Sequence, residues 1–503
     1  MCINQSDDIE KGVQVQIMGE IYKTAKRTII WLGESDEHVA HVQELMRALS
    51  GADSASGEAA ASDDIAVLQH MIGIGNSQSE DCTRRLKAIT SFLNRDWFTR
   101  VWVFQEAVLS KALIIRCGGA ECQFGLLKRI ADAVCDIQYG VEGYARSLVS
   151  TTVGLDTLDL IQHSRKECTR ADCMMSGSEN FLGLLLKVLL QCKATNERDL
   201  IYAFLAFQDP KEQEVIKPNY SLTIENVWTD AAVYIIKSSR SLDLFCAASG
   251  GQRKDLPSWV PDWSKCYSFG RPFAAPDMQS AFCSGGGTQH YWQEPKSATQ
   301  LLVRGKIIDH IDWFSPWNFE TVYYKDVSLQ DFLSIDKHVE SLRRYLYNQH
   351  GMSADSIKSK WLDLDMDILR TLLADGAFGN EQPLSSIADI MATYRKSGDG
   401  EHAENAGEPH GEIAGKLHEL VLILQKKRFF VSEELRLGLA PEDVHRNGAK
   451  VGDAIAILEG SRTPCLLRPL EGNCYQVVSQ CYLDQWMYKV PPDGKSVETF
   501  VLV

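Results

Sequence analysis

The sequence predicts an α/β region at the N-terminus, then a mostly helical region, then a small β-rich region at the C-terminus. Three observations predict this order. Near the N-terminus an apolar repeat of helical period is followed by a short β-branched segment, which is typical of a βαβ unit and its parallel sheet. Helical periodicity then prevails to about residue 425, interrupted by a predicted strand at 301–311. From residue 428 onward, short apolar segments alternate with glycine-containing turns, which predicts strands at 454–458, 464–468, 475–478 and 499–503.

The changes of pattern predict four regions. Residues 1–124 form the α/β region, and 125–325 form a helical middle region that contains a Pro/Trp-rich segment at 256–263. Residues 326–426 are again helical, and 427–503 form the small β-rich region, read as a barrel or twisted sheet. A chain of 503 residues is too long for one hydrophobic core, so two or three domains are expected.

The first stretch, residues 1–33, predicts a helix and a strand. Residues 2–4 are apolar enough to end a strand, and the polar turn Asn4–Asp8 places capping and acidic side chains at a helix N-terminus. The helix has an apolar residue at every fourth position, and we expect this row to face the core: Ile9, Val13, Ile17 and Ile21. The β-branched segment 28–32 then predicts a short buried strand.

The second stretch, residues 95–118, carries the candidate chemistry. It combines several aromatic side chains with one glutamate, Glu106, which lies four residues after Trp102 on the same helix face. A carboxylate beside indole rings is partly desolvated, which raises its pKa and suits it to acid–base or electrostatic catalysis. An ordinary ion pair from Glu106 to Arg100 or Lys111 is the alternative interpretation.

Composition excludes several classes of function. The net charge of −15 argues against nucleic acid as the main partner, because phosphate contacts need clustered Lys and Arg. No apolar run is long enough to span a membrane, since the closest, 181–190, is short and contains Lys187. No signal peptide opens the chain, so a cytoplasmic location is expected.

No metal site is expected. The 14 cysteines include no C-x-x-C pair, and the cluster of His163, Cys168, Cys173 and Cys192 fits no zinc spacing. His38 and His41 read as a solvated helix face. Other segments have plain structural interpretations: Arg198 and Asp199 as ion-pair partners, 51–64 as a surface insertion, and 397–412 as a polar segment.

Two blocks resemble the signature blocks of the fungal heterokaryon incompatibility (HET) domain. They are CINQSDDIEKGVQVQIMGEIYKTAKRTIIWLG and RDWFTRVWVFQEAVLSKALIIRCGG. The segments NERDLIYAFLAF, LPSWVPDWS and RFFVSEELRLGLAPEDVHRNGAKVGDAIAILEG are similar to later parts of such proteins, in the same order. The family's domains open with a further strand and helix before the CINQ block. The resemblance therefore implies a chain truncated within the HET domain, with the first strand of the sheet missing. Region 1–120 would then expose apolar surface and unpaired edges, at a cost in stability.

The resemblance also extends remotely to the TIR domain, whose enzymatic members cleave NAD. It places Glu106 at the catalytic glutamate, makes NAD a substrate rather than a bound cofactor, and implies a TIR-like parallel sheet. The remaining motif residues that it marks are Asn4, Gln5, Asp8, Trp31, Trp97, Arg100, Trp102 and Gln105.

Three functional interpretations stay open. In the first, the chain is a non-self recognition protein that triggers programmed cell death in a filamentous fungus through protein–protein contacts. It would bind an incompatibility partner, with self-association through the HET region and no membrane contact. In the second, the HET region is an NAD-cleaving hydrolase that uses Glu106. In the third, the chain is an inactive, truncated paralogue.

Overall fold

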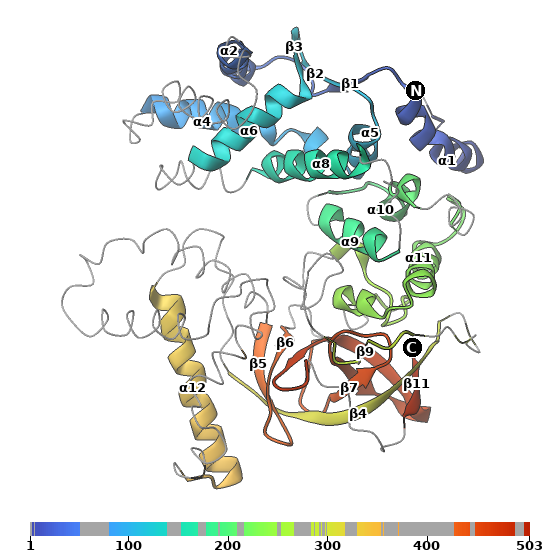
Figure 1. Cartoon of the computed structure of the whole chain (residues 1–503), viewed down its shortest axis with the longest axis vertical. Coiled ribbons are helices and arrows are strands. Elements are labelled where there is room, and N and C mark those ends of the chain that lie inside the picture. The colour runs from blue at the N-terminus through green and yellow to red at the C-terminus, as the bar shows by residue number, and fades with distance from the viewer. Residues whose placement is uncertain are drawn as a thin grey trace, which may run out of the picture. The chain divides into compact units, whose positions relative to one another are not determined.

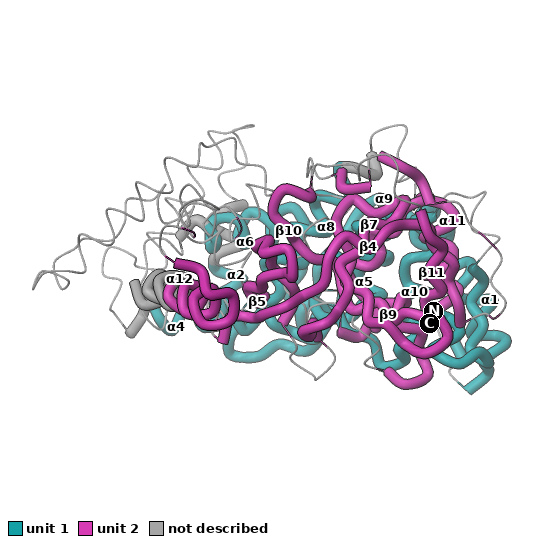
Figure 2. The backbone as a smooth tube through the Cα atoms, turned by 90° about the horizontal axis from the view of Figure 1, so that it is seen from below, with its two compact units in different colours: residues 1–227 teal, residues 228–503 magenta. Residues whose placement is uncertain are grey.

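The computed structural model divides into two compact units, residues 1–227 and 228–503, which are coloured separately in Figure 2. The structure describes residues 3–50 except Gln5, then 80–137, 152–169, 178–189, 192–208, 216–248, 253–265, parts of 283–300, 301–316, 329–353, the single residues 356 and 371, 427–442, 448–487 and 497–503. The predicted insertion at 51–64 and the polar segment at 397–412 lie outside these residues. The division at 124, 325 and 426 stays a prediction.

The first unit alternates helices with a small sheet (Figure 1). Its first part contains α1 (Asp8–Thr24), β1 (Thr28–Trp31), α2 (Glu37–Ser50), α4 (Glu80–Leu93), the 3₁₀ helix η2 (Asp96–Thr99), α5 (Val101–Val108), β2 (Leu113–Cys117), β3 (Ala120–Gln123) and α6 (Phe124–Ile137). Its second part is helical, as predicted: α8 (Val153–Thr169), α9 (Ser178–Leu189), α10 (Asp199–Tyr202) and η4 (Leu205–Phe207). The boundary between the units falls within α11 (Ile224–Ser239).

The sheet of the first unit has three strands in the order β1-β2-β3. β1 and β2 are parallel, which agrees with the predicted parallel pairing, whereas β3 returns antiparallel to β2. The prediction that β1 is buried is wrong for one of its faces. Ile30 is buried, but Ile29 and Trp31 on the opposite face are 48% and 47% exposed. The predicted strand end at residues 2–4 is not found either, since Ile3 and Asn4 are not in a strand.

Helix α1 forms where the sequence predicted a helix, but it buries the opposite face. Ile9, Val13 and Ile17 are 82%, 54% and 44% exposed, while Val15 and Met18 are buried. Two glycines on the buried face explain this choice. A Cβ on Gly12 would lie 2.8 Å from the Pro218 carbonyl oxygen, and one on Gly19 would lie 2.5 Å from Ala206 Cβ. The helix backbone therefore packs directly on the later helical segment, and this approach excludes the aliphatic row.

The second unit is a sheet that closes on itself. Its elements are η5 (Asp243–Ala247), β4 (Leu301–Phe314), α12 (Leu329–His350), β5 (Lys427–Ser432), β6 (Leu437–Pro441), β7 (Ala454–Leu458), β8 (Cys465–Pro469), η8 (Glu471–Asn473), β9 (Cys474–Gln480), β10 (Tyr482–Leu483) and β11 (Glu498–Leu502). The strand order is β10-β6-β5-β4-β11-β9-β8-β7, with a further pairing of β7 to β4. The long strand β4 thus pairs with β11, β7 and β5 along its length, and a ring of strands results.

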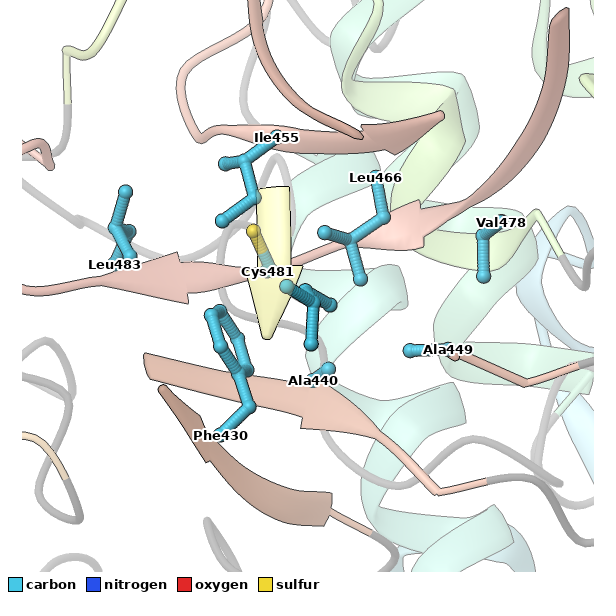
Figure 3. Close-up of a cluster of buried hydrophobic side chains, with 9 residues drawn as sticks. Phe430, Ala440, Ala449, Ile455, Leu466, Val478, Cys481 and Leu483 are labelled. Carbon is cyan, nitrogen blue, oxygen red and sulfur yellow. The ribbon is translucent and has the colours of Figure 1, made fainter. Parts of the chain in front are cut away.

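A cluster of buried apolar side chains forms a hydrophobic core against this sheet. Side chains from several strands point toward one another in Figure 3: Phe430, Ala440, Ile455, Leu466, Val478, Cys481 and Leu483. The predicted strands at 301–311, 454–458, 464–468, 475–478 and 499–503 all lie in this sheet. The coarse fold prediction is therefore confirmed as mixed α/β, with a small sheet containing a parallel pair at the N-terminus, helices in the middle and a β-rich C-terminal sheet.

Candidate functional site

Helix α5 carries the predicted functional residues into the interior of the first unit. Its sequence is almost entirely apolar, and Val101, Val103, Phe104, Ala107 and Val108 are buried. The helix packs against α1, α8, α9 and α10, so its few polar side chains must find partners within the protein. Those partners define the chemistry of the region.

Glu106 is half-buried and faces α1. The Tyr22 hydroxyl makes a hydrogen bond with its carboxylate, and the Arg100 guanidinium lies close enough to interact electrostatically. Burial raises the pKa of Glu106, and this effect outweighs the lowering by Arg100 and by the Tyr22 hydrogen bond. The pKa of Tyr22 is raised in turn, chiefly by burial and then by the negative charge of Glu106. The predicted desolvated carboxylate is thus present, and its hydrogen-bond partner is a phenol.

An open pocket of about 480 Å³ lies at the carboxyl end of β1. Its walls come from the end of β1 and from the segment around η2: Trp31, Leu32, Gly33, Arg95, Asp96, Trp97 and Arg100. The carboxyl ends of parallel strands are the usual location of ligand sites in α/β sheets. Three predicted site residues, Trp31, Trp97 and Arg100, meet here, but Glu106 and Trp102 do not line this pocket.

The two arginines of the pocket have different tasks. Arg95 donates to the Leu32 carbonyl at 2.6 Å and the Glu34 carbonyl at 3.2 Å, and it also pairs with the carboxylate of Asp36. These bonds tie η2 to the chain that leaves β1. Arg100 is exposed, lines the pocket and is close enough to Glu106 to lower the pKa of its carboxyl group. The pocket therefore offers indole surface and one cation, which suit a planar or anionic ligand.

A second polar group joins α5 to α10. Asp199 is 8% exposed and accepts hydrogen bonds from Trp102 Nε1 at 3.1 Å and from the Tyr220 hydroxyl at 2.6 Å. The interpretation of Arg198 and Asp199 as ion-pair partners is corrected: Arg198 Nε donates to the Leu222 carbonyl at 2.7 Å. The hydrogen-bond partners of both residues are neutral groups, and the bond from Trp102 to Asp199 fixes the orientation of the indole ring.

Gln105 fastens α5 to two neighbouring segments. With its amide oriented as its surroundings require, it donates to the Ala203 carbonyl at 2.9 Å and accepts from the Gly19 N–H at 3.3 Å. The side chain is buried, and both bonds reach elements far away in the sequence. Gln105 thus holds α1 and α10 at the distance at which Tyr22 reaches Glu106.

The remaining predicted residues lie at the start of α1. Asn4 accepts from the Ser6 N–H at 3.1 Å, and Asp8 is exposed in the first turn. The helix N-cap is Asp7, which accepts from the N–H groups of Ile9 and Glu10 at 3.0 Å each, as the polar turn predicted. Gln5 lies outside the described residues.

Sequence reasoning missed Tyr22, Asp199, Tyr220 and the two pocket residues next to Trp97 as members of the site. Only Arg95 and Asp96 carried a local signal, since they stand beside the aromatic residues of the second block. For the metal candidates, Cys173 is outside the described residues, and His38 pairs with Glu37 at 3.8 Å. Across the described ranges, no group of three or more His, Cys, Asp or Glu side chains is arranged to hold a metal. In the same ranges no helix has the length and hydrophobicity needed to cross a bilayer.

Fold and site together define a class. It is a two-unit protein whose α/β unit holds a carboxylate, hydrogen-bonded to a tyrosine, near a pocket lined by tryptophan and arginine side chains. Residues 1–106, which include this carboxylate, match the family described as heterokaryon incompatibility protein (HET). The HET match thus covers this N-terminal part of the chain. The whole chain is similar to heterokaryon incompatibility protein 6, OR allele, of Neurospora crassa, with 24% identity over 576 aligned positions that cover 100% of this chain and 82% of that protein. No solved structure matches the chain.

Proposed function

We propose that the chain acts in heterokaryon incompatibility, as a non-self recognition protein that triggers cell death in a filamentous fungus. The observation that carries this proposal is the similarity to the Neurospora crassa protein along the entire chain, together with the HET match at residues 1–106. The first unit is the effector in this proposal, and the rest of the chain senses an incompatibility partner through protein–protein contacts in the cytoplasm. The net charge of −15 supports a protein partner over a nucleic acid.

The test uses fusion between fungal strains. Strains that express the chain are paired with strains that carry divergent alleles of candidate partner genes, and death of the fused cells is measured with a vital dye. Death confined to particular pairings is the expected result. Equal viability in all pairings, with the protein present at normal abundance, contradicts the proposal.

The second candidate function is NAD cleavage by the first unit, in agreement with the remote TIR-like resemblance. The observation that favours it is the environment of Glu106, which is desolvated, hydrogen-bonded to Tyr22 and close to a cation, Arg100. In this reaction the bond between the ribose carbon and the nicotinamide nitrogen breaks, and nicotinamide leaves. Water then adds to the ribose carbon and releases a proton, which gives ADP-ribose. The carboxylate of Glu106 stabilises the oxocarbenium-like centre, as carboxylates do in glycoside cleavage.

The enzymatic candidate has a matched pair of variants. Glu106→Gln keeps the shape of the side chain and removes its charge, whereas Glu10→Gln makes the same change at an exposed position of α1. Expression in yeast, with growth and NAD measured together, separates the candidates. Loss of NAD with the native chain and with Glu10→Gln, but not with Glu106→Gln, supports the enzyme. Growth arrest with constant NAD supports action through protein contacts alone.

A further inference from the structure

Strand β1 presents an unpaired edge. In the described part of the chain it pairs with β2 on one side, and no strand pairs with it on the other. Thr28 N–H and Leu32 N–H donate to the Ala112 and Arg116 carbonyls at 2.8 and 2.9 Å. Because backbone groups alternate along a strand, those of Ile29 and Trp31 point away from β2. An open strand edge with exposed apolar side chains is a template for pairing with another chain.

We propose that this edge pairs with the same edge of a second copy of the chain, antiparallel about a twofold axis at Ile30. In this register Ile29 stands opposite Trp31 of the second copy, and the symmetry repeats the pair. These are the two residues whose N–H and C=O groups point outward, so each pair exchanges both main-chain hydrogen bonds. If the strands are shifted from this register, the overlap between them becomes shorter, or Ile29 and Trp31 no longer face residues whose backbone groups point outward.

The side chains agree with this register. Ile29 and Trp31 share one face of the sheet and are 48% and 47% exposed. Opposite residues of an antiparallel pair lie on the same face, so each Ile29 packs against a Trp31. Pairs of an aromatic and a β-branched residue are among the stabilising cross-strand combinations. The proposed contact therefore covers the two large apolar side chains that β1 leaves in solvent.

Charge complementarity identifies the partner as a second copy. Beyond the ends of the paired strands, the same register brings the segment that carries Lys26 of one copy to the end where Glu34 of the other leaves β1, on both sides of the axis. Both side chains are exposed. A strand from an unrelated protein would have no reason to carry a glutamate and a lysine at the two positions that complement those of β1. An isologous contact supplies both by symmetry.

The contact is small, so the dimer is expected to be weak. Paired four-residue strands bury much less than the roughly 1,200 Å² typical of a stable interface. Sedimentation velocity of the full chain over a concentration series is therefore the appropriate measurement. We expect reversible dimers that become more abundant as concentration rises.

A charge-reversal set tests the register. Lys26→Glu places like charges opposite each other twice and is expected to weaken dimerisation roughly tenfold, since each cross-strand pair contributes up to about 1 kcal/mol. The double variant Lys26→Glu with Glu34→Lys is expected to restore it. Trp31→Lys should abolish dimers, while Val451→Lys, at another exposed apolar residue, should leave them unchanged. A native chain that stays monomeric at all concentrations, or dimers that ignore these changes, overturns the proposal.

A cysteine cross-link tests the same register without relying on affinity. A mixture of Ile29→Cys and Trp31→Cys chains is expected to form an intermolecular disulfide under mild oxidation, located by mass spectrometry of the linked peptides. Either variant alone should form it far less, because identical positions are offset in this register. Linkage of Ile29→Cys to a native cysteine of the same chain would show that the chain covers its own edge, and would overturn the proposal.

Discussion

The hydroxyl of Tyr22 in α1 is hydrogen-bonded to the carboxylate of Glu106 in α5, and burial raises the pKa of both groups. The two residues are far apart in the sequence, and they meet because Gln105 and the glycines of α1 hold the two helices close together. Burial raises the pKa of this carboxyl group, while the positive charge of Arg100 lowers it by a smaller amount. The stability of the first unit should therefore depend on pH through Glu106.

We expect Glu106→Gln to gain stability relative to the native chain as the pH rises. The folded-state pKa of Glu106 lies above its ordinary value of 4.5, so the protonated group stabilises the fold. This contribution is fully present below about pH 4.5 and is lost as the pH rises through the raised pKa. Urea unfolding of both proteins at a series of pH values measures the difference. A difference between Glu106→Gln and the native chain that does not change with pH contradicts the assignment.

Asp199→Ala should destabilise the first unit by about 2–4 kcal/mol. The substitution leaves the Trp102 indole N–H and the Tyr220 hydroxyl without their acceptor in a largely buried place, and each lost partner costs about 1–3 kcal/mol. Denaturant unfolding followed by tryptophan fluorescence measures the loss. Asp96→Ala, at an exposed aspartate, serves as the control and should change stability by less than about 0.5 kcal/mol. Equal losses of stability in the two variants would contradict the prediction that the hydrogen bonds of Asp199 stabilise the first unit.

Gly19→Ala should destabilise the protein although alanine favours helices. In an isolated helix the change gains about 1 kcal/mol, but here the new Cβ would lie 2.5 Å from Ala206 Cβ and push α1 off its neighbours. Thermal unfolding of Gly19→Ala and of Gly125→Ala separates the two effects. Gly125 in α6 has nothing within 4 Å of an added Cβ, so the control is expected to be neutral or slightly stabilising. A stabilised Gly19→Ala would show that the close approach of α1 is wrong.

The same glycines show what the sequence could and could not predict. The four-residue spacing of Ile9, Val13 and Ile17 predicted the helix correctly, because periodicity reports secondary structure. It predicted the wrong buried face, because the choice of face depends on what packs against the helix. The partner surface at 206 and 218 lies about 200 residues away in the sequence, and only the pair Gly12 and Gly19 indicated a close contact.

The candidate site shows the same limit. The aromatic second block marked Trp97, Arg100 and Glu106 as neighbours along one segment, and the structure places the first two in the pocket. Tyr22 and Asp199 could not be predicted as partners, because their contacts depend on how α1 and α10 pack on α5. Similarly, the strands of the C-terminal sheet were predicted individually, but the closure of β7 on β4 was not, since pairing between distant strands leaves no local pattern.

Gly305→Ala should destabilise the second unit by about 2–4 kcal/mol, because Gly305 lies where β4 pairs with two other strands at once. It pairs with Glu498 of β11 on one side and with Leu458 of β7 on the other. An added Cβ would lie 2.4 Å from the Ile457 carbonyl oxygen and 2.7 Å from a methyl carbon of Leu458, so β7 would have to move away. That movement would open the ring of strands around the apolar cluster.

The neighbouring substitution Arg304→Ala is the matched control for Gly305→Ala. Arg304 is half-exposed and lies 3.6 Å from Glu459, and an exposed ion pair of this kind contributes about 0–1 kcal/mol. Hydrogen exchange of the β7 amides, measured with denaturant unfolding, distinguishes opening of the ring from a general loss of stability. We expect faster exchange in β7 for Gly305→Ala and native rates for Arg304→Ala. Native exchange in β7 of the glycine variant would mean that β4 and β7 do not approach each other as closely as the pairing requires.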